Sequence, residues 1–194
     1  MVNPNSISLM DAIYNRRSVR DYLPQKVSKD LINILLDAAV QAPSALHEEP
    51  CAFAIIQNKS LLDRLSECAK KMLHDESLQT KSEKRKHILD VVEQPEFHVF
   101  YNATTLVVIC SKFQDSFVEA DCWLAAENLM LSAYAHGLGS RVIGFSAPAL
   151  NLPEWKTEIG IPDEMNAVVP IILGTPSDQP LSSGRKSPEI IAWK

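Results

Sequence analysis

The order of the elements expected from this sequence places the chain in the α+β class. Helical segments outnumber strands, and the two do not alternate as a regular βαβ series, which argues against an open parallel sheet. The length of 194 residues fits one ordinary domain with its own hydrophobic core. We therefore expect residues 1–194 to form a single domain.

Two helices are expected in the first part of the chain. Ser8, with Asp11 three residues later, forms a capping box. Apolar residues that share one face of this helix are Ile7, Met10, Ile13 and Tyr14. After Pro24, Ser28 caps a second helix, which Pro43 ends. Its apolar stripe consists of Leu31, Ile34, Leu35, Ala38, Ala39 and Ala42.

A strand and a third helix follow. Residues 52–57 predict a buried strand, and Asn58-Lys59 a turn. Ser60 and Asp63 form a second capping box, for a helix that carries Leu61, Leu65, Cys68, Ala69 and Met72. A polar helical stretch then continues to Glu93 and stops before Pro95.

The second half begins with a strand over residues 104–110, rich in β-branched side chains. Residues 118–136 have the length of a helix but are apolar nearly all round. Such a helix is buried on more than one side, within the core or between subunits. Gly137 and Gly139 are expected to cap its end. A short strand or turn over 141–145, a short helix over 153–159 and a strand over 167–173 complete the set.

The tail, residues 174–194, is rich in Pro, Ser and Gly, yet it ends in Ile190, Ile191 and Trp193. Exposed apolar residues at the end of a polar tail indicate docking on another surface, for which a second subunit is one candidate.

Composition narrows the function classes. With 46% hydrophobic and 22% charged residues, the chain resembles soluble globular proteins. A net charge of -5 makes nucleic acid a poor partner, and the apolar runs are too short to cross a bilayer. The N-terminus lacks the pattern of a signal peptide, so we expect a cytoplasmic protein.

The four cysteines form no C-x-x-C pair and are expected as reduced, buried thiols. The five histidines lack the spacing of metal ligands. The phosphate loops of nucleotide-binding motifs are also missing from the sequence.

Three arginines and a serine lie close together where the first helix ends: Arg16, Arg17, Ser18 and Arg20. The planar guanidinium fork suits phosphate oxygens, and a hydroxyl adds a further donor. The alternative is an exposed basic helix end that complements the helix dipole. Spacing alone favours that alternative, because a helix C-terminus is the wrong end for a dipole-based anion site.

An ordered series of short motifs resembles the FMN-dependent nitroreductase family. The motifs are Ile13-x-x-Arg16-Arg17-Ser18-Val19-Arg20-Asp21-Tyr22, Ala39-x-x-Ala42-Pro43-Ser44-Ala45, Pro50 with the strand that follows, Phe100-Tyr101-Asn102-Ala103, Glu127-Asn128-Leu129, Gly137-Leu138-Gly139, Ile143-Gly144-Phe145, Leu173-Gly174-x-Pro176 and Gly184-Arg185-Lys186-Ser187-Pro188-Glu189. The resemblance implies a central, mostly antiparallel sheet flanked by helices. It also implies a homodimer with two FMN sites across the interface, the C-terminal tail packing on the partner.

The resemblance also assigns roles to residues. Arg16, Ser18 and Arg20 match positions that contact FMN, with Arg16 on the phosphate; in several relatives the residue at Arg20 approaches the pyrimidine edge instead. Arg17 matches a further position near the phosphate. The remaining implied contacts are the loop from the partner subunit (Pro43, Ser44 and Ala45), the turn beside flavin N5 (Ile143 and Gly144) and the C-terminal basic residues that close the phosphate site (Arg185 with Lys186).

This chain departs from the family pattern in the loop after Pro43-Ser44. His47, Glu49 and Cys51 stand where the family usually has Asn, Gln and Trp. His47 either replaces the asparagine as a donor to the flavin or is simply solvated. Ionised Glu49 cannot donate to the ring, and the small Cys51 side chain leaves a wider or differently shaped site. These changes bear on substrate range.

The implied activity is a ping-pong cycle in which NADH or NADPH reduces the flavin, and a nitroaromatic, quinone or related acceptor then reoxidises it. No acid–base side chain is required, so no catalytic residue is assigned. Two alternatives stay open. One is a flavin enzyme of the same fold with another outcome, such as reductive dehalogenation or flavin cleavage. The other is a flavin-binding regulatory module without turnover.

Overall fold

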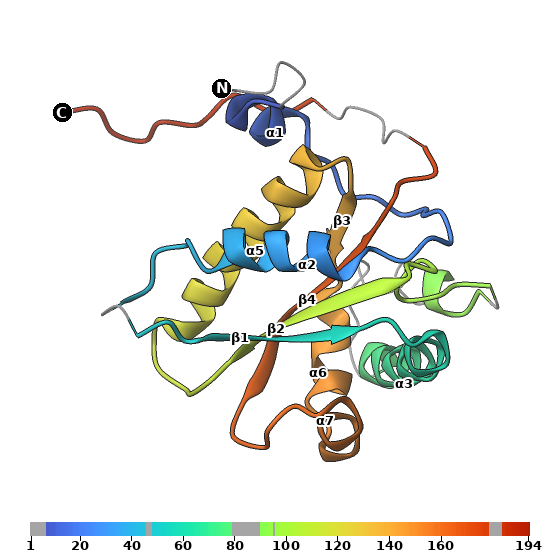
Figure 1. The fold of residues 1–194 in the computed structure, drawn as a ribbon. Coiled ribbons are helices and arrows are strands. Elements are labelled where there is room, and N and C mark those ends of the chain that lie inside the picture. Colours follow the sequence, from blue (N-terminus) through green and yellow to red (C-terminus); the bar gives the residue numbers. More distant parts are fainter. Residues whose placement is uncertain (1–6, 46–47, 79–89, 95, 179–183) are drawn as a thin grey trace.

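A computed structural model describes residues 7–45, 48–78, 90–94, 96–178 and 184–194 of the chain. The described residues contain one four-stranded antiparallel sheet in the order β1-β2-β4-β3 (Figure 1). The strands are β1 Cys51–Ile56, β2 Thr105–Ser111, β3 Gly139–Val142 and β4 Asn166–Gly174. The α+β class and the antiparallel sheet expected from the sequence are therefore confirmed.

The two central strands carry the core. Every residue of β2 is buried, and β4 is buried over its last six residues. β1 lies at an edge, and only Ile56 of this strand is buried, so the prediction of a buried strand was wrong for its degree of burial. An apolar run of this length does not distinguish an edge strand from a central one.

Helices cover both faces of the sheet (Figure 1). On one face, α2 (Lys29–Ala39) and α5 (Val118–Ala135) pack against Val107 and Ile109 of β2. On the other, α3 (Lys59–Leu78), α6 (Ala147–Leu150) and α7 (Pro153–Ile159) pack against Leu106 and Val108. Successive β2 side chains thus supply two separate cores, as alternation along a strand requires.

The first two helix caps form as expected. The Ser8 hydroxyl accepts the Asp11 N–H at the start of α1 (Leu9–Asn15), and the Ser28 hydroxyl accepts the Leu31 N–H at the start of α2. The buried faces differ from the prediction. In α1 only Ala12 is buried, and its apolar face is exposed. In α2 the buried residues are Ile32, Leu35 and Ala39, whereas Ile34, expected in the stripe, is exposed; the helix stops at Ala39.

The cap of α3 is not the predicted one. The Asn58 side chain accepts the Leu61 N–H at 3.1 Å, and α3 begins at Lys59, one residue before Ser60. Asp63 instead contacts Lys59 and His98. The capping box predicted at Ser60 was therefore wrong, because the Asn58 side chain, two residues earlier, supplies the capping acceptor. Residues 90–92 are helical; the rest of the polar stretch, 79–89, lies outside the described residues.

The long helix α5 forms over the predicted span and is buried on two sides, against α2 and against the sheet. A third side exposes Trp123 and Leu124. Gly137, at a φ of +76°, ends the helix: its N–H bonds the Tyr134 carbonyl, and the next N–H, of Leu138, bonds that of Ala133. Gly139 was also predicted as a cap, and this is wrong, because Gly139 already begins β3.

The described tail residues, 184–194, run in extended form without helix or strand, away from the sheet (Figure 1). Ile191 and Trp193 are almost fully exposed. None of the described helices is long and apolar enough to span a membrane.

Candidate functional site

The arginine-containing segment docks on the edge strand β3. Ser18 and Ser140 form a parallel bridge, and the Val19 N–H donates to the Ser140 carbonyl at 3.2 Å. Val19 is buried against Gly139, where an added Cβ would lie 2.6 Å from Val19 Cγ2. The backbone of residues 16–20 is therefore held against the strand that leads into Ile143 and Gly144.

The arginines of this segment do different things. Arg16 is mostly buried, and its Nε lies 3.8 Å from Glu127 Oε1 of α5. Arg17 donates from Nη1 to the carbonyls of Tyr14 and Arg16, both at 2.8 Å. For Arg17 the structure thus shows the helix-end role that spacing favoured. Ser18 and Arg20 are exposed beside β3.

Arg141 of β3 is a further cation beside this segment, and it was not among the residues predicted from the sequence. Its guanidinium lies over the Tyr101 ring, 4.6 Å from the ring centroid, and its buried Nη1 has no hydrogen-bond partner among the described residues. Burial lowers the pKa of Arg141, and the nearby charge of Arg20 lowers this pKa further. The signal that could have found it is a lone cation two residues before Ile143-Gly144.

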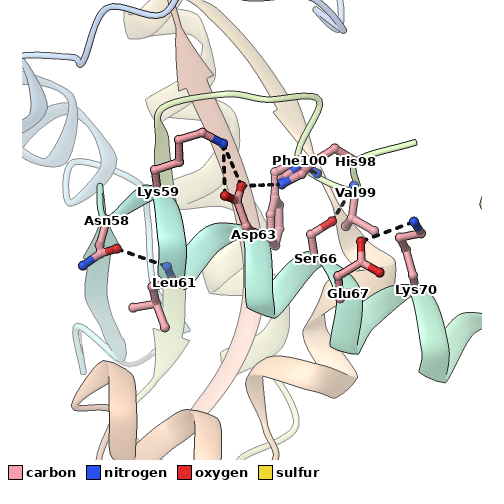
Figure 2. A network of polar contacts seen from close by, with 10 residues as sticks. All are labelled: Asn58, Lys59, Leu61, Asp63, Ser66, Glu67, Lys70, His98, Val99 and Phe100. Atoms are coloured by element: carbon pink, nitrogen blue, oxygen red, sulfur yellow. Dashed lines mark hydrogen bonds and ion pairs between the residues drawn. The ribbon is translucent and has the colours of Figure 1, made fainter. Parts of the chain in front are cut away.

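The turn that carries Tyr101 is anchored on α3, as Figure 2 shows. His98 Nε2 lies 3.2 Å from Asp63 Oδ1, and His98 Nδ1 accepts the Phe100 N–H at 3.2 Å. The Val99 N–H donates to the Ser66 hydroxyl at 2.9 Å. These bonds hold a turn whose next residue, Tyr101, has a φ of +50°. Packing thereby fixes the ring beneath the Arg141 guanidinium.

β3 leads directly into the Ile143-Gly144 turn. Ile143 is fully buried, its N–H donates to the Pro170 carbonyl, and its carbonyl accepts the Ser146 hydroxyl. At Gly144 an added Cβ would meet no atom within 4 Å, so open space lies beside this backbone. A planar ligand can approach the main chain there.

The loop at residues 43–45 lies elsewhere. The Ala45 N–H donates to Asp121 Oδ2 at 3.1 Å, near the start of α5. β3 follows the other end of that helix, and Asp121 and Ala135 are separated by about 21 Å along its axis at 1.5 Å per residue. Within one chain, the structure does not bring Pro43, Ser44 and Ala45 to Ser18 and Gly144.

This loop borders a pocket of about 370 Å³ between α2, β1 and α5. Its wall includes Pro43, Ser44, Glu49 and Cys51, which are residues that the sequence singled out. Lys112 lies at the pocket and donates from Nζ to the Glu49 carbonyl at 2.8 Å. His47 lies outside the described residues.

Arg185 and Lys186 are exposed in the extended tail. Neither makes a hydrogen bond or an ion pair with any residue in the part of the chain that the structure describes, Arg16 included. In the same part of the chain, His, Cys, Asp and Glu side chains form no group of three or more that could hold a metal ion.

Comparisons with known proteins agree with this fold. The model of the nitroreductase family matches residues 13–175, so this chain belongs to the nitroreductase family, a family of oxidoreductases. An inferred NADH dehydrogenase/NAD(P)H nitroreductase from Archaeoglobus fulgidus is 27% identical over 172 residues, 86% of this chain and 84% of that protein.

Solved structures show the same fold. A nitroreductase with bound FMN from Bacteroides fragilis superposes with a TM-score of 0.79 at 26% identity and covers 98% of both chains. An iodotyrosine deiodinase bound to FMN and 3-iodo-L-tyrosine superposes with a TM-score of 0.75 at 20% identity, over 94% of this chain and 97% of that chain. Proteins with this fold therefore differ in substrate, and the fold alone does not define the acceptor.

Proposed function

We propose that this chain binds FMN and uses NADH or NADPH to reduce a small organic acceptor such as a nitroaromatic compound or a quinone. The observation that carries the proposal is the docking of residues 16–20 on β3. This contact places exposed donors from Ser18 and Arg20 beside the strand that leads to the open backbone at Gly144.

The residues where segment 16–20 docks on β3 suit a flavin mononucleotide. Ser140 Oγ and Arg141 Nη1 are buried without a hydrogen-bond partner among the described residues, and buried donors of this kind favour a ligand that completes them. Arg16, Arg17 and Ser18 would hold the phosphate side, joined by Arg185 and Lys186 of the tail.

The reactive ring would lie against the Ile143-Gly144 turn, where the absence of a side chain allows close approach. When bound, FMN supplies two-electron redox chemistry between a nicotinamide donor and the acceptor, in turn. Arg20 and Arg141 place positive charge beside this turn and favour the extra negative charge of the reduced state. No acid–base side chain is assigned, so acceptor protons come from solvent.

A homodimer is part of the proposal. Pro43, Ser44, Ala45 and His47 would reach the FMN of the partner, since the described part of this loop lies at the opposite end of α5 from Ser18 in one chain. The exposed apolar face of α1, the exposed Trp123 and Leu124 of α5, and Ile191 and Trp193 of the tail support such an interface. We propose that the tail packs on the partner subunit.

The test begins with the visible spectrum of the protein after FMN is added and the excess is removed. A flavin absorption band that stays with the protein is expected; a colourless protein contradicts the proposal. Anaerobic mixing with NADH and with NADPH should then bleach this band. If neither donor bleached a bound flavin, the proposed NAD(P)H-dependent activity would be wrong, and the protein would instead be a flavin-binding module without this turnover. Steady-state rates with nitroaromatic, quinone and halogenated acceptors define the substrate class.

A further inference from the structure

Two cysteines that are far apart in the sequence meet in the structure. Cys51 begins β1, Cys122 lies on α5, and their sulfur atoms are 3.7 Å apart in a thiol–thiol hydrogen bond. The sequence predicts four reduced, buried thiols, and it contains no Cys-x-x-Cys spacing that would predict this pair. The contact arises because α5 packs across the edge strand of the sheet.

The two thiols differ in access. Cys51 is half-buried and lines the pocket of about 370 Å³, whereas Cys122 is fully buried behind it. The expectation that every thiol is buried was therefore wrong for Cys51, and also for Cys68, which is partly exposed. A small reagent that enters the pocket meets Cys51 first and leaves Cys122 as the neighbouring second thiol.

The surroundings also favour ionisation of the outer thiol. The hydrogen bond with Cys122 lowers the pKa of Cys51, opposed by partial burial and by Asp121 and assisted by the charge of Lys112. The same hydrogen bond, together with burial, raises the pKa of Cys122. Cys51 is thus the attacking sulfur and Cys122 the one that keeps its proton, which is the division of roles found in reactive dithiols.

We propose that Cys51 and Cys122 form a redox-active dithiol that peroxides oxidise to a disulfide. The Cys51 thiolate attacks one peroxide oxygen, the O–O bond breaks and hydroxide leaves, which gives a sulfenic acid at Cys51. The Cys122 sulfur then attacks the Cys51 sulfur, and water leaves after the Cys122 proton is transferred. In total, the two thiols lose two electrons and one hydrogen peroxide becomes two waters.

The geometry needs little change for this reaction. An S–S bond is about 2.05 Å long, so the two sulfur atoms must approach by about 1.7 Å from their present separation. The other two cysteines have different surroundings. Cys68 accepts the indole N–H of Trp155 at 3.2 Å, and burial raises the pKa of Cys110 to about 11. Neither offers an accessible thiolate next to a second thiol. The pocket at Cys51 shares Pro43 and Ser44 with the proposed contact to the partner's FMN, but oxidation of the thiol pair does not require bound flavin.

The test treats the reduced full-length protein with hydrogen peroxide and counts thiols by mass spectrometry. We expect the loss of two of four thiols, a mass decrease of about 2 Da, and a cross-linked peptide pair that contains Cys51 and Cys122. Cys122→Ser should stop at a sulfenic acid on Cys51 that dimedone traps, and Cys51→Ser should form no cross-link. The matched control, Cys68→Ser, should still form it. Four intact thiols, or a disulfide that involves Cys68 or Cys110, would overturn the proposal.

A second measurement needs no variant and so does not depend on folding of the mutants. Phenylarsine oxide bridges two thiols only when their sulfur atoms lie close together. In the reduced wild-type protein it should bind with one-to-one stoichiometry and protect Cys51 and Cys122, but not Cys68, from alkylation by a maleimide. Unprotected Cys51 and Cys122 at saturating reagent would show that the pair does not act as a dithiol.

Discussion

Gly139 lies so close to Val19 that a methyl group does not fit between them: an added Cβ would be 2.6 Å from Val19 Cγ2 and 2.8 Å from Val19 Cβ. Val19 is buried, and its N–H donates to the Ser140 carbonyl, so packing and this hydrogen bond hold Val19 against β3. The glycine therefore sets the distance between β3 and the segment that carries Arg16, Ser18 and Arg20.

Gly139→Ala should destabilise the protein by about 1–3 kcal/mol, the usual range for an overpacked site. It should also weaken FMN binding, because residues 16–20 must move away from β3. Urea unfolding and an FMN titration measure the two effects. Gly184→Ala is the control, since a Cβ there would meet nothing within 4 Å, and its unfolding midpoint should equal that of the wild type. An unchanged midpoint for Gly139→Ala would contradict the close contact.

Two variants separate the observed cap of α3 from the one that the sequence suggested. Asn58→Ala removes the acceptor of the Leu61 N–H and should cost about 1 kcal/mol of unfolding free energy. Ser60→Ala, at an exposed position inside the helix, should leave stability unchanged or slightly higher, since alanine is the better helix former. Urea denaturation of both variants tests this pair, and the reverse order of stabilities would restore the capping box at Ser60.

The fold class and most of the elements were predictable from local pattern. Ser28, the β-branched run of β2 and the glycine after α5 each act within a few residues, so the sequence shows them directly. Exposure was less predictable. Whether Ile34 or Ile32 of α2 faces the core depends on the position of α5 and the sheet, which no short segment encodes.

In the candidate site, too, the residues in local motifs were predictable from the sequence, whereas contacts between distant segments were not. Motif order led to Ser18, Arg20 and Gly144, and the structure brings these segments together along β3. Arg141 was missed because its relation to Tyr101 depends on a turn that α3 anchors from another part of the chain. The Cys51–Cys122 contact likewise joins residues 71 positions apart. Contacts of this kind follow from tertiary packing and have no local signature.

His98 should make stability depend on pH. Its Nδ1 accepts the Phe100 N–H, so the ring is neutral with its proton on Nε2, and burial lowers the pKa of His98 below the ordinary 6.5 despite Asp63 (Figure 2). Below pH 6.5 the unfolded chain binds this proton more readily than the folded chain. The contribution of His98 is therefore fully present above pH 6.5 and is lost as the pH falls from there towards the folded-state pKa.

The measurement compares wild type with His98→Ala by urea unfolding at a neutral and at an acidic pH. At neutral pH the variant should be less stable by about 1–3 kcal/mol, because a buried N–H is left without its acceptor. At acidic pH the difference should shrink. A difference that grows on acidification would mean that the folded state favours the charged ring, contrary to the contacts that His98 makes.

Removal of Arg16 and Arg185 together should release FMN. The structure leaves Arg185 exposed in the extended tail, and among the described residues Arg16 contacts a single carboxylate, that of Glu127, at 3.8 Å. Charge-assisted hydrogen bonds contribute about 1.5–3 kcal/mol each, so loss of both should raise the FMN dissociation constant at least about 100-fold. The matched control, Lys26→Ala with Lys71→Ala, removes the same charge from exposed positions and should bind FMN as the wild type does. Fluorescence quenching of FMN gives both constants. If the arginine double variant bound FMN like this control, the phosphate would have to be held elsewhere, and the role proposed for residues 16–20 would be wrong even if the flavin were bound.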